Sequence, residues 1–189
     1  MLNSFTPGSL LHRAAQFAHA AHAAVDQRRK YTNVPYIEHP FAVARLVLTV
    51  TDDKATVAAA LLHDTVEDTQ ATRADIEREF GADVAQLVEW LTDVSQPSDG
   101  NRAVRKEIDR QHLAQADPRA KTVKLADLID NTRSIVTYDR HFARVYLVEK
   151  ERLLEVLTDG HPEMYRLAFE TLQRAQATLA NLDSLADAS

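Results

Sequence analysis

Residues 55–69, ATVAAALLHDTVEDT, join the longest apolar run of the chain to its densest polar cluster. The first eight residues are apolar apart from Thr56, so a helix formed by them has no polar face to turn toward water. We therefore expect a buried central helix from Ala55 to Leu62, which ends on the polar cluster His63 to Thr69. A helix of this kind needs other elements packed around it on every side.

Amphipathic spacing on both sides of this run predicts further helices. They cover residues 7–27, 39–50, 72–81, 83–93, 102–115, 118–137, 140–158 and 162 to about 180. Thr72 and Asp75 have the spacing of an N-terminal capping pair, and Gly81 is a typical stop. The sequence SQPSDGN at 95–101 is the clearest loop, and neither strand alternation nor an internal repeat is present. We predict an all-α fold, a single helical bundle of roughly eight to ten helices, with one domain over residues 1–180 and a polar tail at 181–189.

Composition excludes several classes of protein. The 22 basic and 28 acidic residues give a net charge of −6, which argues against binding to nucleic acid or to an anionic membrane surface. The absence of cysteine excludes disulfide scaffolds and thiolate metal sites. No segment approaches the roughly 18 apolar residues that a membrane span needs, and the first residues lack the pattern of a secretory signal. We expect a cytoplasmic protein.

The polar cluster that follows the apolar run is suited to metal binding. On a continuous helix, His63 would share a face with Glu67, and Asp64 would share one with Asp68. Three carboxylates and an imidazole in six residues repel one another and lose hydration unless a positive charge lies among them. A divalent metal would supply that charge. The alternative is an ordinary solvated helix end.

Two further segments favour the metal. His39 precedes Pro40 in PYIEHP at 35–40, a rigid helix start, and Asp127 lies within an otherwise apolar helix in VKLADLIDNTR at 123–133. Together with His63 and Asp64, they would supply two imidazole nitrogens and two carboxylates. This set suits manganese, iron or zinc, and the ligand types alone do not choose among them.

Five segments carry a resemblance to a known family. They are QRRK at 27–30, PYIEHP at 35–40, AALLHDTVEDT at 59–69, FGADVAQLV at 80–88 and VKLADLIDNTR at 123–133. In these segments and their order, the chain resembles the HD-domain phosphohydrolases, and within them the hydrolase domain of the RelA/SpoT family. Without a synthetase or regulatory domain, it is similar to the stand-alone small alarmone hydrolases.

The resemblance implies roles for particular residues. It implies that one Mn²⁺ per chain is bound by His39, His63, Asp64 and Asp127. It assigns to Glu67 and Asp68 the activation of water and the protonation of the leaving oxygen, with support of the metal-binding histidines as the alternative. For substrate, it implies pyrophosphate contacts from Arg29 and Lys30, further phosphate contacts from Arg102 and Lys106, and nucleoside contacts from Asn131, Ser134 and Tyr146. Core packing is an equal alternative for Tyr146.

Two positions depart from the family pattern. Leu128 stands where relatives often have arginine or lysine, and Asp130 stands where histidine or tyrosine is common, which adds negative charge near a phosphate site. The activity implied is Mn²⁺-dependent hydrolysis of the 3′-pyrophosphate of ppGpp or pppGpp to GDP or GTP and pyrophosphate. The alternatives are a related hydrolase acting on adenosine alarmones or on the 2′-phosphate of NADPH, and a protein that binds alarmone without cleaving it. In each case the partner is a small nucleotide.

Overall fold

The computed structural model describes residues 5–187, apart from the side chains of residues 134, 186 and 187. Over this range the fold is all-α, as predicted, and the only β-type pairing is an isolated bridge between Arg28 and Pro35. The helices are α1 (Leu10–Ala24), α2 (Glu38–Val47), α3 (Lys54–Leu62), α4 (Thr65–Asp68), α5 (Arg73–Phe80), α6 (Ala82–Leu91), α7 (Arg102–Ala114), α8 (Pro118–Tyr138), α9 (Arg140–Leu154) and α10 (Pro162–Asp187), with a 3₁₀ turn, η2, at Pro97–Asp99.

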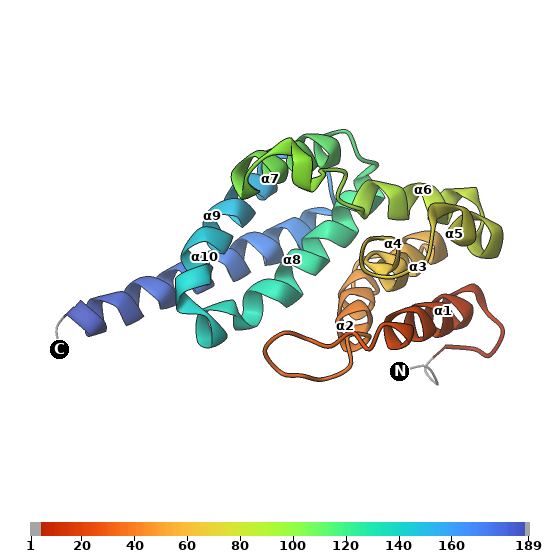
Figure 1. The fold of residues 1–189 in the computed structure, drawn as a ribbon, viewed down its shortest axis with the longest axis horizontal. Helices are drawn as coiled ribbons and strands as arrows, with labels where there is room; N and C mark the ends of the chain where they lie inside the picture. The colour runs from red at the N-terminus through yellow and green to blue at the C-terminus, as the bar shows by residue number, and fades with distance from the viewer. Residues whose placement is uncertain (1–4, 188–189) are drawn as a thin grey trace.

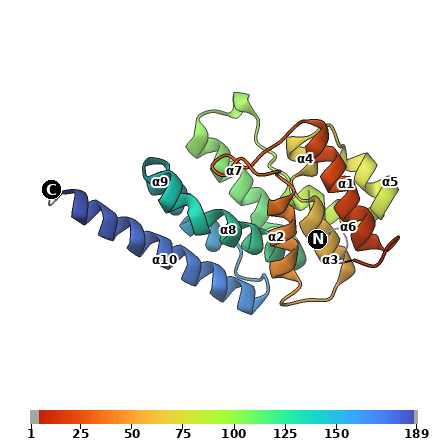
Figure 2. The same ribbon diagram turned by 90° about the horizontal axis from the view of Figure 1, so that it is seen from below.

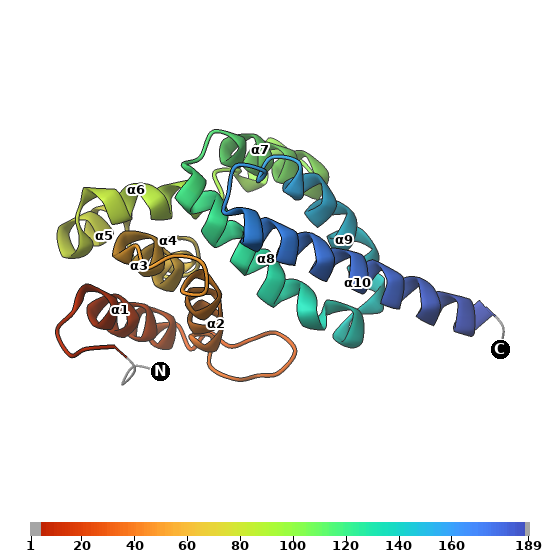
Figure 3. The ribbon, with the colours of Figure 1, turned by 180° about the vertical axis from the view of Figure 1, so that it is seen from behind.

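The helices gather into two groups joined by α8. Helices α1 to α6 lie at one end of the molecule, and α7, α9 and α10 lie at the other (Figure 1). Helix α8 runs between them and packs against α2, α3 and α6 on one side and α9 and α10 on the other. The last turns of α10 extend beyond the other helices, as the views from below and from behind also show (Figures 2 and 3).

The predicted central helix is present and buried. Every residue of α3 from Thr56 to Leu62 is buried, and α3 packs against α1, α2, α6 and α8. Each fully buried leucine contributes roughly 1.5–3 kcal/mol of transfer free energy. The chain turns at residues 63 and 64, where His63 is still buried and Asp64 is partly exposed.

The predicted capping pair also forms. The Thr72 side chain accepts a hydrogen bond from the Asp75 amide, and the Asp75 carboxylate accepts one from the Thr72 amide. Gly81 ends α5 with a φ of 88°, in the left-handed region that favours glycine.

Two helix boundaries differ from the prediction. Residues 63 and 64 form a turn between α3 and the single-turn helix α4, so His63 to Asp68 do not lie on one continuous helix. At the other end of the chain, α10 continues past Ala180 to Asp187. Leu179 and Leu182 keep the apolar spacing that packs this helix on the core, and Asp183 pairs with Arg144 of α9 at 2.6 Å.

No helix in residues 5–187 is both long enough and apolar enough to cross a bilayer.

Candidate active site

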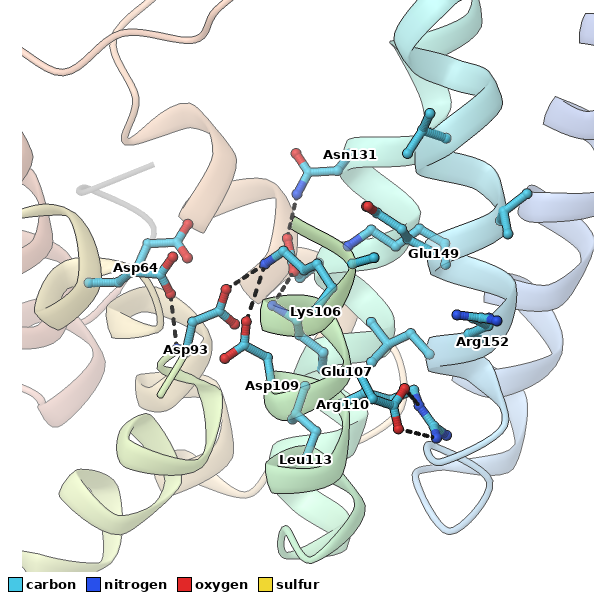
Figure 4. A pocket seen from close by; sticks show the side chains of 18 of the residues that line it. Asp64, Asp93, Lys106, Glu107, Asp109, Arg110, Leu113, Asn131, Glu149 and Arg152 are labelled. Carbon is cyan, nitrogen blue, oxygen red and sulfur yellow. Dashed lines mark hydrogen bonds and ion pairs between the residues drawn. The ribbon is translucent and has the colours of Figure 1, made fainter. Parts of the chain in front are cut away.

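A cavity of about 550 Å³ opens between the two helix groups. Its lining comes from α4, α7, α8 and α9 and from the segments that precede α2, α4 and η2. Figure 4 shows Asp64 at one side of the cavity and Arg110 and Arg152 at the other, with Asp93, Lys106 and Asp109 between them. The volume suits a nucleotide-sized ligand.

Asp64 and Asp127 line one side of the cavity, and the buried His39 and His63 contact these two carboxylates. We call the four residues predicted to bind metal the metal-binding end: His39, His63, Asp64 and Asp127. Ligand atoms of His39, His63 and Asp64 all lie within 4.8 Å of one another. Oδ1 of Asp127 lies 3.1 Å from Nε2 of His39 and 4.0 Å from Nε2 of His63. Three segments that are far apart in the sequence therefore meet here, with His39, His63 and Asp64 in one cluster and Asp127 beside it.

Local structure explains this convergence. His39 lies in the first turn of α2, His63 follows the last residue of α3, and Asp127 is in the middle of α8. Because α3 packs against both α2 and α8, the three helices bring their side chains together at the end of α3. Asp64 occupies the turn between α3 and α4, where its Oδ2 accepts a hydrogen bond of 2.7 Å from the Tyr36 hydroxyl.

The hydrogen-bonding pattern leaves lone pairs facing one another. Nδ1 of His63 lies 2.9 Å from the carbonyl oxygen of Ala60, which only accepts, so Nδ1 carries the ring hydrogen and Nε2 of the neutral ring presents a lone pair. The Nε2 atoms of His39 and His63 are buried and have no hydrogen-bond partner. Each faces carboxylate oxygens of Asp64 and Asp127. Two imidazoles and two carboxylates in this arrangement fit a divalent cation.

The protonation equilibria also indicate a site built for positive charge. Burial by itself would lower the pKa of His39, but Asp127, Asp130 and Asp64 around the ring raise it to about 9. Burial would raise the pKa of Asp64, yet the neighbouring His63 and His39 hold it well below its usual range. The surroundings therefore favour a positive charge at the point where a metal would lie.

Asp130 orients one of the histidines from behind. Its Oδ2 lies 2.7 Å from Nδ1 of His39, and the same oxygen accepts a hydrogen bond of 3.3 Å from Arg29. A carboxylate on the far nitrogen of a metal-binding histidine fixes the ring and increases its basicity. The negative charge of Asp130 is therefore shared between His39 and Arg29.

Glu67 faces the cavity beside the metal-binding end. Its Oε2 accepts a hydrogen bond of 3.2 Å from the Asp93 amide. The cavity walls remove part of its solvent, and with the negative charge of Asp93 they raise the pKa of Glu67 to about 7, although Lys124 acts in the opposite direction. A carboxylate with this pKa can both take up and release a proton near neutral pH.

Asp68 occupies a different environment. It does not line the cavity, and its Oδ2 accepts a hydrogen bond of 2.9 Å from the Gln27 side chain, whose own oxygen lies 2.6 Å from Nδ1 of His22. Partial burial raises the pKa of Asp68, and the Gln27 hydrogen bond opposes that shift.

The predicted substrate-binding residues fall into two sets. Lys106 and Asn131 line the cavity. Asn131 also bridges two other residues, because it donates to Oδ1 of Asp127 at 2.6 Å and its Oδ1 accepts from Arg29 at 3.0 Å. Arg29 therefore lies directly behind the metal-binding end.

The second set lies outside the cavity lining. Lys30 pairs with Asp139 at 3.6 Å, Arg102 forms a two-bond ion pair with Glu149 at 2.7 and 2.8 Å, and Tyr146 is buried in the core cluster. The Ser134 side chain is outside the described part of the chain. Leu128, the other departure from the family pattern, is fully buried in the core.

Three contributions to the site were not predicted from the sequence: the contact of Tyr36 with Asp64, the contact of Asp130 with His39, and the place of Lys150 in the cavity lining. Tyr36, which holds Asp64, lies within PYIEHP, but nothing in the sequence connects it to residue 64. Asp130 follows Asp127 by three residues, a helical spacing that could have indicated a shared face. Lys150, which lines the cavity, follows Tyr146 by one helical turn and could have been found in the same way.

Comparison with protein families and with curated proteins gives consistent results. A family model described as "HD domain" matches residues 14–152. The guanosine-3′,5′-bis(diphosphate) 3′-pyrophosphohydrolase MESH1 of Xenopus tropicalis is 42% identical over 130 residues, which cover 67% of this chain and 70% of that protein. A GTP pyrophosphokinase of Streptomyces coelicolor is 36% identical over 164 residues, which cover 86% of this chain but only 18% of that protein.

Solved structures agree with the sequence matches. A metazoan SpoT orthologue, described as hydrolysing ppGpp and acting in starvation responses, has a TM-score of 0.79 at 29% identity, over 90% of this chain and 97% of that one. The protein lmo0812 of Listeria monocytogenes EGD-e has a TM-score of 0.62 at 26% identity, over 76% of this chain and 99% of that one.

Proposed function

This chain belongs to the HD-domain family, and on that basis we propose that it hydrolyses the 3′-pyrophosphate of guanosine 3′,5′-bis(diphosphate)-type alarmones. The products are GDP or GTP and pyrophosphate. The similarity to the Xenopus hydrolase and to the metazoan SpoT orthologue supports this substrate class.

One observation carries the proposal. The buried cluster of His39, His63 and Asp64, with Asp127 beside it, opens onto a nucleotide-sized cavity into which Glu67 also projects. A metal-binding cluster beside a carboxylate that faces the same cavity is an arrangement suited to hydrolysis of a phosphate ester.

We propose that His39, His63, Asp64 and Asp127 hold one Mn²⁺, the ion that the family resemblance implies and with which two imidazoles and two carboxylates are compatible. When bound, the metal supplies Lewis acidity, which polarises phosphoryl oxygens and acidifies water. Lys124 keeps Asp127 ionised for this role, because its Nζ lies 3.0 Å from the carboxylate. Asp130 holds the His39 ring in place through the 2.7 Å contact with Nδ1.

Glu67 is the proton carrier in this proposal. A bond forms between the oxygen of water and the phosphorus attached to the 3′-oxygen, and the bond from that phosphorus to the 3′-oxygen breaks. Glu67 accepts a proton from the attacking water, and this proton is then delivered to the departing 3′-oxygen. Asp68, which Gln27 holds by a hydrogen bond of 2.9 Å, supports the metal-binding end or serves as the second proton carrier.

Lys106 and Asn131 are the proposed substrate contacts that already line the cavity. Arg29 would reach the pyrophosphate from behind the metal-binding end by exchanging one of its present partners, Asp130 or Asn131, for phosphate. Contacts from Lys30, Arg102, Ser134 and Tyr146 remain predictions from the family resemblance.

The proposed partner is a small nucleotide. The net charge of −6 supports the prediction that nucleic acid is not a ligand. Because alarmones are nucleotides that are made and used in the cytoplasm, we propose that location for the protein.

A panel of nucleotides tests the proposal. The Mn²⁺-loaded protein is incubated with ppGpp, pppGpp, the corresponding adenosine alarmone and NADPH, and the products are resolved by chromatography. We expect pyrophosphate, with GDP or GTP, from the guanosine alarmones.

The products separate the alternatives. Orthophosphate released from NADPH alone would assign a phosphatase instead. Binding of ppGpp without turnover, with metal confirmed in the protein, would assign an alarmone-binding protein. Either result would overturn the proposed hydrolysis.

A further inference from the structure

The residues that α9 contributes to the cavity form what we call the α9 wall: Arg144, Val145, Val148, Glu149, Lys150, Arg152 and Leu153. None of them belongs to the metal-binding end. Two cations of this wall, Lys150 and Arg152, have no carboxylate oxygen of the described residues within 4.0 Å, and of the two Arg152 is exposed to solvent whereas Lys150 is partly shielded from it. Among the described residues, the one close partner of Lys150 is the ring of Tyr146, whose centroid is 4.9 Å from the ammonium group.

The other two lysines of the cavity are neutralised by carboxylates. Nζ of Lys106 lies 2.6 Å from Asp93 and 3.6 Å from Asp109, as Figure 4 shows. Nζ of Lys124 lies 3.0 Å from Asp127. Lys150 has no such ion pair, and Asp127 and Asp93 act on its charge only from beyond ion-pair distance.

The lining carboxylates near the α9 wall are also engaged elsewhere. Glu149 binds Arg102 through two hydrogen bonds, and Glu107 binds Arg110 through two more, at 2.8 and 2.9 Å. Both carboxylates are therefore neutralised by arginine and do not pair with Lys150.

A cation that is withdrawn from water without a countercharge is destabilised. Burial and the positive charge of Lys124 lower the pKa of Lys150 to about 8, so the side chain still carries its proton at neutral pH. An anionic ligand in the cavity would supply the missing countercharge and form a charge-assisted hydrogen bond with Nζ.

We propose that Lys150 binds the 5′-diphosphate of the nucleotide, the group that is not cleaved, and so selects substrates that carry a second phosphorylated position. This inference rests on the proposed function. The cleaved group must lie at the metal-binding end, which α2, the α3–α4 turn and α8 form, whereas Lys150 belongs to α9. A substrate with two diphosphates needs two separate positive sites, and Lys150 is the partly buried cation of the cavity that has no ion pair among the described residues.

The residues next to Lys150 suit the rest of such a ligand. Val145 and Val148 line the cavity and are 50% and 54% exposed. Apolar side chains exposed within a cavity favour contact with a ribose or a base. The α9 wall therefore offers an apolar surface beside an unpaired cation.

Binding without turnover tests the inference. Affinities for GDP, guanosine and inorganic pyrophosphate are measured by calorimetry in EDTA, for the wild type, Lys150→Met and Lys150→Arg. Lys54→Met, a change at an exposed lysine at the start of α3, serves as the control. We expect Lys150→Met to weaken GDP binding by about ten- to a hundredfold while guanosine binding stays unchanged, and Lys150→Arg to retain most of the GDP affinity.

Three results would overturn the inference. They are unchanged GDP affinity in Lys150→Met, an equal loss for GDP and guanosine, and a loss for pyrophosphate as large as that for GDP, which would place Lys150 on the cleaved group. These results do not depend on hydrolysis. A wild-type protein that releases no pyrophosphate from ppGpp fails the proposed function, whereas the GDP result decides the assignment of Lys150.

Discussion

The two sides of the cavity differ in how their charges are balanced. At the metal-binding end, Asp64 and Asp127 are held by Tyr36, Asn131 and Lys124, and the remaining lone pairs face a single point. On the α9 wall, Lys150 faces the cavity with an aromatic ring as its only close partner among the described residues.

This difference in charge balance corresponds to two tasks, catalysis and recognition of the substrate. A reaction centre needs groups fixed in advance, because the energy of reorganising them would otherwise add to the barrier. A site that recognises substrate can leave a charge unpaired and let the ligand complete it. We infer that the metal-binding end carries out the chemistry and that the α9 wall selects the nucleotide.

The largest expected effect would come from Asp64→Asn. The amide keeps the shape of the side chain but removes the charge that both histidines face, so we expect kcat for pyrophosphate release to fall by at least about a thousandfold. Steady-state kinetics with ppGpp measure this loss.

GDP affinity provides the control for Asp64→Asn. If the two sides of the cavity act separately, GDP binding should remain within about twofold of the wild type. A variant that keeps more than a tenth of its activity would show that the chemistry does not depend on the metal-binding end.

Asp130→Asn should have an intermediate effect. Without the carboxylate on Nδ1, the His39 ring is less basic and less firmly oriented, so we expect Mn²⁺ affinity to fall by about ten- to a hundredfold. Electron paramagnetic resonance of free Mn²⁺ in a titration measures the affinity directly. Asp52→Asn, at an exposed aspartate before α3, should leave it unchanged. If Asp130→Asn bound Mn²⁺ as tightly as Asp52→Asn does, Asp130 would have no role in orienting His39, and only its ion pair with Arg29 would remain.

The smallest effect concerns the stability of the metal-free protein. Because the pKa of Glu67 is raised from 4.5 to about 7, the folded state holds this proton more tightly than the unfolded state does. Its contribution to stability is therefore lost as pH rises from about 4.5 to 7. Glu67→Gln cannot ionise, so we expect its Tm to exceed that of the wild type at pH 8 by roughly 1–3 °C, with little difference at pH 4.

Thermal unfolding in EDTA at several pH values measures this gap. Glu79→Gln, at an exposed glutamate of α5, should show no such dependence on pH. A Tm gap for Glu67→Gln that stays constant from pH 4 to pH 8 would contradict the raised pKa.

Local patterns predicted most of the fold. The apolar run of α3 and the capping pair at Thr72 depend on neighbours within one or two helical turns, and both formed as expected. The turn at 63–64 was missed because residues 63–68 have good helical spacing, and packing around α3, rather than propensity, determines where that helix ends. The continuation of α10 was missed because its final residues are polar, although Leu182 still packs on the core.

The candidate site was only partly predictable, because several of its contacts join residues that are far apart in the sequence. The four residues of the metal-binding end lie in segments that carry the family resemblance. The contacts of Asp130 with Arg29 and of Tyr36 with Asp64 join residues that are 101 and 28 positions apart. No local pattern predicts such contacts, since they depend on how α8 packs against α2 and α3. Lys150 was missed because its significance lies in the countercharge that it lacks.

The position of α8 between the two helix groups has a consequence for divergence within such a family. This helix supplies Asp127 to one side of the cavity and supports α9 on the other, while α9 itself supplies no residue of the metal-binding end. Substitutions on the exposed face of α9 can therefore change which nucleotide fits without disturbing the groups that cleave it. Directed evolution toward a new substrate should begin at Val145 and Val148, which line the cavity without belonging to the metal-binding end.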